Sequence, residues 1–207
     1  AISSGLVLRS HALIFSLFAF IIGTLFALQL NKNSQLVSIC ISLPLIIGYN
    51  AKLKYFPLIG NIVVALILSL SFIYAGFIFD NIKPLIIPAV LAFGLTLIRE
   101  IVKDMADIIG DKSVGLRTFP IIYGENKTIV LFTVLSSLLG IGSFVPFITG
   151  YYNIFYGILL ILTVEIPLAV VVILLLNKPN ITTAKRSTKL LKFCTLGGLF
   201  SIYIGTI

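Results

Sequence analysis

Long apolar runs without a single charge constrain this chain more than any other feature of its sequence. No charged residue occurs from Tyr55 to Phe79, or from Thr128 to Val164. A helix that crosses a bilayer needs about 20 mostly apolar residues, whereas a helix on a soluble domain shows a polar stripe at the helical period. Only 11% of the 207 residues are charged, against about a quarter in soluble domains. The sequence therefore predicts an all-α, multi-pass transmembrane helical bundle.

Short polar segments between the apolar runs predict seven spans in a single transmembrane domain that covers residues 1–207. The predicted spans are residues 11–30, 35–51, 57–79, 84–103, 127–149, 154–176 and 189–207. Pro44 is expected to kink or shorten the second span, because proline removes a helical hydrogen bond.

The basic residues predict which side of the membrane each loop faces. Only Lys32 and Lys83, of 15 basic residues, lie on one side of the predicted topology. Cytoplasmic loops carry an excess of Lys and Arg, so the other side is predicted to be cytoplasmic, in a cell membrane. The same rule explains the net charge of +8. No basic stripe interleaved with aromatic residues indicates nucleic acid as a partner.

Residues 99–118 concentrate the acidic side chains. The acids at positions i, i+4, i+7 and i+11 are Glu100, Asp104, Asp107 and Asp111. This spacing places them on one helical face if the helix continues that far, where like charges repel by a few tenths of a kcal/mol per pair. A cation should compensate. Magnesium binds one or two carboxylates together with water and substrate phosphates, so we expect a magnesium–phosphate site.

A solvated loop of mixed charge is the alternative interpretation of this segment. In that case Lys103, Lys112 and Arg117 would neutralise the acids without a metal. Two observations favour the metal site. Most of the chain's seven acids lie in this region, and Gly110 and Gly115 interrupt the helix there, as expected where a backbone approaches a ligand.

Two motifs resemble those of UbiA-type membrane prenyltransferases. The first is D-x-x-D-x-x-x-D followed by G-x-[KR]-[ST], formed by Asp104, Asp107, Asp111, Gly115, Arg117 and Thr118. The second is a Tyr/Lys loop with a Gly-Asn pair that opens the next helix, formed by Tyr49, Lys52, Lys54, Gly60 and Asn61. The residues that flank the first motif, 99–104 and 118–120 with Gly124, resemble the branch of archaeal ether-lipid synthesis.

The sequence departs from the family pattern at its start. The family has nine helices and a first aspartate motif, N-x-x-x-D-x-x-x-D, between its first two. That motif is not in this sequence, and residues 1–5 resemble the segment just downstream of it. We therefore expect about seven of the nine helices here, in an N-terminally truncated domain. The missing ligands would come from a preceding segment or from another chain.

The resemblance implies a magnesium-dependent transfer of a prenyl group, expected to be geranylgeranyl, from its diphosphate to the hydroxyl of geranylgeranylglyceryl phosphate. It implies that Asp104, Asp107 and Asp111 hold the metal, and that Asp107, Asp111 and Arg117 act in catalysis. Substrate contacts are expected from Tyr49, Lys52, Lys54, Asn61, Lys103 and Arg117. The prenyl tail would lie among the apolar helices, next to membrane lipid.

Several of these residues also have a purely structural interpretation. Lys52 and Lys54 would serve as interfacial anchors, Tyr49 as an interfacial belt residue, and Asn61 as a helix cap.

Other functions stay open at this point. Within the family, an aromatic quinone precursor is the alternative acceptor. From a different class, a transporter would need polar groups at mid-membrane depth, where only Glu165 qualifies. Glu165 is either functional or a hydrogen-bonded packing residue. Because the other acids cluster at one interface, we favour an enzyme over a transporter or a structural membrane subunit.

Overall fold

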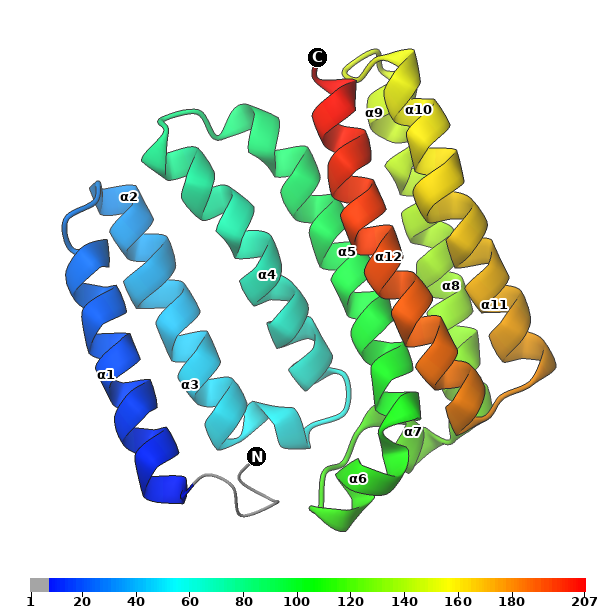
Figure 1. The fold of residues 1–207 in the computed structure, drawn as a ribbon, viewed down its shortest axis with the longest axis horizontal. Coiled ribbons are helices and arrows are strands. Elements are labelled where there is room, and N and C mark those ends of the chain that lie inside the picture. Colours follow the sequence, from blue (N-terminus) through cyan, green and yellow to red (C-terminus); the bar gives the residue numbers. More distant parts are fainter. Residues whose placement is uncertain (1–7) are drawn as a thin grey trace.

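The computed structural model describes residues 8–207, so the resemblance noted for residues 1–5 lies outside the described residues. These residues form a bundle of helices (Figure 1). The helices are α1 (Arg9–Ala27), α2 (Lys32–Gln35), α3 (Leu43–Ala51), α4 (Ile59–Ile78), α5 (Lys83–Ala106), α6 (Ile108–Ser113), α7 (Phe119–Tyr123), α8 (Glu125–Ser143), α9 (Val145–Ile148), α10 (Ile154–Leu160), α11 (Ile166–Asn177) and α12 (Ile181–Gly205). Two π-helical segments, η1 (Leu36–Ser42) and η3 (Ile161–Glu165), and a 3₁₀ turn, η2 (Leu53–Tyr55), complete the fold.

Six helical stretches among the described residues are long and apolar enough to cross a membrane. They are Ser10–Ala27, Lys32–Ala51, Ile59–Ile78, Lys83–Ala106, Glu125–Ile148 and Ile154–Asn177. Six of the seven predicted spans therefore correspond to such stretches, and the all-α, multi-pass fold is confirmed. The seventh, α12, is a helix of 25 residues, but the four basic residues of its first half make it less apolar than the others.

Asparagine caps explain why two helices begin earlier than the hydropathy predicts. Asn180 accepts a hydrogen bond from the Thr183 amide at 2.8 Å, so α12 starts at Ile181 rather than near residue 189. The Asn31 side chain accepts a hydrogen bond from the Ser34 amide at 2.9 Å. Helix α2 therefore starts at Lys32, within the polar segment that was predicted to separate the first two spans. A capping side chain satisfies an amide that has no partner in the first helical turn.

Both π-helical segments are followed by a proline. Pro44 follows η1 and Pro167 follows η3, each in the first turn of the next α-helix. Proline has no amide hydrogen and its ring crowds the carbonyl four residues earlier, and a wider π turn accommodates this. The second span therefore continues through Pro44 as one helical rod from Lys32 to Ala51.

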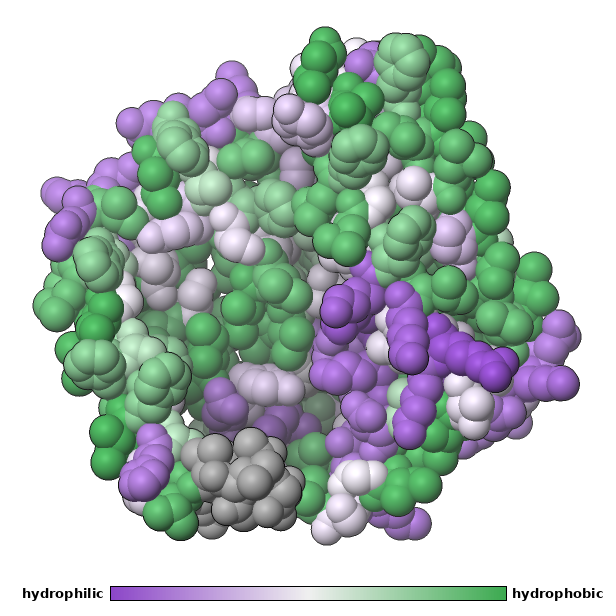
Figure 2. All heavy atoms as spheres, viewed as in Figure 1, coloured by the Kyte–Doolittle hydropathy of each residue, from purple (hydrophilic) through white to green (hydrophobic). Residues whose placement is uncertain are grey.

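The centre of the bundle is the crossing of α5 and α12, against which α8, α10 and α11 pack on one side and α4 on the other (Figure 1). The largest buried side chains in this core include Phe132, Ile98 and Tyr156. Helix α1 is exposed along nearly its whole length and contacts chiefly η1. Large apolar side chains cover much of the outer surface (Figure 2), as expected of helices that face lipid.

Candidate functional site

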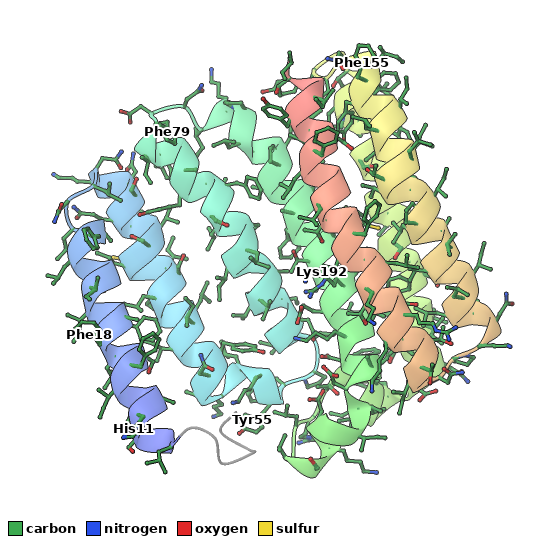
Figure 3. The ribbon with its side chains drawn as sticks, in the orientation of Figure 1. His11, Phe18, Tyr55, Phe79, Phe155 and Lys192 are labelled. Carbon is green, nitrogen blue, oxygen red and sulfur yellow. The ribbon has the colours of Figure 1, made fainter. Side chains whose placement is uncertain are left out.

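The predicted acidic segment and the predicted Tyr/Lys loop meet in one cavity at one end of the bundle. The cavity has a volume of about 110 Å³. It is lined by Tyr49, Lys54, Phe56, Gly60, Asn61, Val64, Glu100, Lys103, Asp104, Asp107, Asp111, Leu116 and Thr118. We call the cavity that these residues line the acid cavity. Figure 3 shows Tyr55, in the turn η2, at the same end of the bundle as α6, whereas Phe79 and Phe155 lie at the opposite end.

Ion pairs neutralise Glu100, the first acid of the segment. Its side chain is buried and accepts a hydrogen bond from Arg99 Nη1 at 2.7 Å and another from Lys103 Nζ at 3.2 Å. A buried carboxylate needs such partners, because desolvation penalises an isolated charge. Glu100 therefore anchors two cations beside the cavity, a role that its charge alone did not reveal.

Asn61 and Asp104 join α4 to α5 inside the cavity. Asn61 Nδ2 donates a hydrogen bond to Asp104 Oδ2 at 2.9 Å, and Asn61 is 7% exposed. The capping interpretation of Asn61 is wrong, because Leu58 occupies the N-cap of α4 and the Asn61 side chain crosses to α5 instead. Its amide orients the Asp104 carboxylate by a charge-assisted hydrogen bond.

Asp107 and Asp111 lie beyond the end of α5. The helix ends at Ala106, Asp107 has non-helical backbone angles, and α6 restarts at Ile108. The acids therefore do not form one face of a single continuous helix, as the spacing allowed. Asp107 and Asp111 nevertheless line the same cavity. Burial raises the pKa of the Asp111 carboxyl, and the charge of Asp107 raises it further, so a cation between them would relieve repulsion.

These acids do not form a complete metal site by themselves. Within residues 8–207, no three side chains of Asp, Glu, His or Cys come close enough together to hold a metal. A metal here needs further oxygen ligands, such as substrate phosphates.

The chain returns to the cavity after α6 through a Schellman motif. The Leu116 amide bonds the Asp111 carbonyl at 2.9 Å, and the Gly115 amide bonds the Lys112 carbonyl at 3.2 Å. Gly115 has φ +75°, a left-handed conformation that glycine adopts without steric cost. This turn brings Leu116 and Thr118 to the cavity wall.

Thr118 is a cavity residue to which the sequence analysis assigned no role. Its side chain is 8% exposed, and Oγ1 has no hydrogen-bond partner within the described part of the chain. A buried hydroxyl without a partner costs about 1–3 kcal/mol. The only sequence signal was its position at the end of the G-x-[KR]-[ST] motif.

A tight turn between α3 and α4 places Tyr49 and Lys54 at the cavity. A Cβ on Gly60 would lie 3.2 Å from the Lys54 Cα and 3.5 Å from Tyr49 Cε2, so glycine permits the close approach. Leu58 adopts φ +63°, which is strained for a non-glycine residue. Lys52 and Arg117 are exposed and do not line the cavity, so the structure brings together all expected site residues except these two.

An apolar cavity of about 180 Å³ lies next to the acid cavity along the same two helices. Val64 of α4 lines the acid cavity and Leu68, one turn further, lines the apolar one. On α5, Glu100 lines the first and Thr96 the second. Side chains of α8, α10, η3 and α12 close the apolar cavity. The molecule therefore offers a polar, acidic compartment followed by a hydrophobic one.

Glu165, on η3, lines neither of these two cavities, although its hydrogen-bond partner Ser143 lines the apolar one. Ser143 Oγ donates a hydrogen bond to Glu165 Oε1 at 2.9 Å, and Tyr156 Oη donates to the Ser143 carbonyl at 2.7 Å. The chain carries no mid-membrane line of charges that would suggest an ion path within residues 8–207. The structure therefore shows Glu165 hydrogen-bonded between packed helices.

Comparisons with known proteins agree with this architecture. Residues 1–195 match the UbiA prenyltransferase family. The chain is 36% identical over 164 residues to the digeranylgeranylglyceryl phosphate synthase of Methanosphaera stadtmanae, covering 79% of this chain and 58% of that protein. It is 36% identical over 210 residues to the synthase of Saccharolobus solfataricus, covering 100% of this chain and 72% of that protein.

A solved structure of a digeranylgeranylglyceryl phosphate synthase superposes with a TM-score of 0.81 at 30% identity. The match covers 99% of this chain and 72% of that structure. The similarity thus extends over the whole described bundle, while the relatives are longer than the chain. The chain belongs to the UbiA prenyltransferase family, the integral-membrane transferases of prenyl groups.

Proposed function

We propose that the protein transfers a geranylgeranyl group from its diphosphate to the hydroxyl of geranylgeranylglyceryl phosphate, with Mg²⁺ as cofactor. The names of its relatives support this substrate pair. One structural observation carries the proposal: carboxylates of α5 and α6 and the Lys54 side chain line one cavity, and an apolar cavity follows it along α4 and α5. A prenyl diphosphate has the same division, with an anionic head and a hydrocarbon tail.

Asp107 and Asp111 are the proposed magnesium ligands of this chain. Their side chains line one cavity, and burial first, then the charge of Asp107, raises the pKa of the Asp111 carboxyl. Magnesium takes one or two carboxylates and completes its shell with water and phosphate oxygens, which fits a pair better than a closed cage. Asp104, bonded to Asn61, would support this pair. Bound magnesium would supply Lewis-acid neutralisation of the diphosphate.

The reaction requires stabilisation of a leaving anion. The allylic carbon–oxygen bond breaks and its electron pair leaves with the diphosphate. The acceptor hydroxyl oxygen then attacks the allylic cation, and its proton passes to the released diphosphate. Lys54 and Lys103 would bind diphosphate oxygens, and Tyr49 and Asn61 would bound the site. Fixed positive charges stabilise the leaving anion more strongly in a site that excludes water than they would in solution.

Arg117 and Lys52 are proposed to contact the diphosphate from the rim. Each is next to residues of the cavity region, since Arg117 lies between Leu116 and Thr118, and Lys52 is two residues from Lys54. Both side chains are long and exposed, so a change of rotamer can carry the charge to the cavity mouth. Arg117 would bind phosphate as a fork, and lysine as a point charge.

The assay that tests the substrate pair uses the full-length protein in liposomes with labelled geranylgeranyl diphosphate. Geranylgeranylglyceryl phosphate and an aromatic quinone precursor are offered separately as acceptors. We expect product only with the lipid acceptor and only with magnesium present. Transfer to the aromatic acceptor alone would contradict the proposed substrate and identify the other branch of the family.

A further inference from the structure

The first half of α12 carries a group of exposed basic side chains that the acid cavity does not use. They are Lys185, Arg186, Lys189 and Lys192. Figure 2 shows hydrophilic side chains gathered over this half of α12, bordered by apolar ones. Ion pairs within residues 8–207 join only Arg99 and Lys103 to Glu100, so no carboxylate of the described chain neutralises the α12 cations.

Lys192 differs from the other three in its depth. It lies near the midpoint of α12 (Ile181–Gly205), two turns further along the helix than Lys185. Lys185 and Arg186 satisfy the positive-inside rule at the interface. Lys192 is the basic residue furthest along α12, and it lies inside the predicted span 189–207 rather than in the loop before it.

Lys192 lies about one helical turn from a residue that lines the apolar cavity. Thr195 of α12 and Thr96 of α5 both line the apolar cavity. Lys192 is three residues before Thr195. Arg99 is three residues after Thr96. Residues three apart on a helix are neighbours on its surface. Helices α12 and α5 pack against each other, and Figure 3 shows Lys192 where α12 passes over α5. The two cations therefore flank the end of the apolar cavity that is nearer to the acid cavity.

We propose that Arg99 and Lys192 bind the phosphate monoester of the acceptor lipid. This inference rests on the proposed function and adds the acceptor's place in it. Arginine offers phosphate a planar fork and lysine a point charge. Arg99 adjoins Glu100, which lines the acid cavity, so a phosphate held here places the neighbouring glycerol hydroxyl close to the allylic carbon of the donor.

The test uses the full-length protein in nanodiscs of zwitterionic lipid, with Lys192→Gln, Lys192→Arg and the control Lys178→Gln. Lys178 is an exposed loop residue that lines neither cavity. A lost charge-assisted bond to phosphate weakens binding about tenfold or more. We expect Lys192→Gln to raise the acceptor KM by about that factor and to leave the KM of the prenyl diphosphate unchanged. Lys192→Arg should restore most of the affinity, and Lys178→Gln should resemble the wild type.

A binding arm separates this proposal from the proposed reaction. Geranylgeranylglyceryl phosphate and its dephosphorylated form are bound to each variant without donor, and only the phosphorylated lipid should depend on Lys192. If binding of the phosphorylated lipid depends on Lys192 but no variant transfers a prenyl group, the phosphate site is supported and the proposed reaction is contradicted. Transfer with an unchanged acceptor KM in Lys192→Gln, or a raised KM for the diphosphate, would overturn the site. An effect of Lys192→Gln seen only in discs of anionic lipid would assign the cluster to bulk headgroups and overturn the proposal as well.

Discussion

At the scale of single residues, the site depends on hydrogen bonds that cross between helices. The sequence placed Asn61 and Asp104 in two separate motifs, and the family resemblance expected both in one site. Their direct bond at 2.9 Å could not be predicted, because it depends on the relative rotation of α4 and α5. The unpartnered Thr118 hydroxyl is of the same kind, since only the folded loop shows that no neighbour reaches it.

Asn61→Ala should destabilise the protein and reduce transfer. The substitution leaves the Asp104 carboxylate without its amide donor, and such a loss costs about 1–3 kcal/mol. Thermal unfolding in detergent and the transfer assay measure the two effects. Asn50→Ala is the control, because Asn50 is exposed and bonds only the carbonyl of its own helix at Ile46. Equal effects of the two substitutions would show that the Asn61–Asp104 bond contributes nothing specific.

At the scale of elements, hydropathy and punctuation predicted most helices but not their internal irregularities. The run from Tyr55 to Phe79 contains α4, and the run from Thr128 to Val164 contains most of α8 and all of α10. The π segments before Pro44 and Pro167 and the interruption at Asp107 were not predicted. Prolines and closely spaced like charges mark where a regular helix is disfavoured. Tertiary packing then decides whether the chain forms a kink, a wider turn or a break there.

Close packing of α12 on η3 predicts a position that tolerates no side chain. A Cβ on Gly197 would lie 2.5 Å from the Thr163 Cβ, whereas a Cβ on Gly142 meets nothing within 4 Å. Gly197→Ala should therefore lower the unfolding free energy by about 1–3 kcal/mol. Gly142→Ala should leave it unchanged or raise it, because alanine is the better helix former. Thermal unfolding of both variants checks this, and a neutral Gly197→Ala would mean that the two elements separate readily.

At the scale of the whole molecule, the loop charges predicted that the two motifs lie on one side of the membrane, and the family resemblance implied that they form one site. Lys54 and the three aspartates line one cavity, and their part in the reaction stays a prediction. Family membership favours an enzyme over the transporter considered from composition. The apolar cavity beside the acid cavity was not predicted, since its walls come from α4, α5, α8, α10, η3 and α12 and depend on how these elements pack.

The proposed cytoplasmic orientation of the acid cavity can be measured directly. With Cys40 and Cys194 replaced by Ser, a single cysteine is introduced at Lys112, beside the cavity, or at Lys83, at the other end of α5. An impermeant maleimide added outside intact cells should label the Lys83 variant only, because the basic loops are proposed to lie inside. The opposite labelling pattern would reverse the orientation.

The most direct test of the central claim, that Asp107 and Asp111 hold magnesium against a prenyl diphosphate, is the transfer rate of Asp107→Asn and Asp111→Asn in the full-length protein. Each substitution removes a ligand charge with little change of shape. Losing one well-placed electrostatic contact typically costs about 10²–10³ in rate, and relief of the carboxylate repulsion should leave stability unchanged or slightly higher. We predict losses of about that size with unfolding temperatures at or above the wild-type value, and no transfer in a chelator. Wild-type rates in either variant, or in the chelator, would contradict the account.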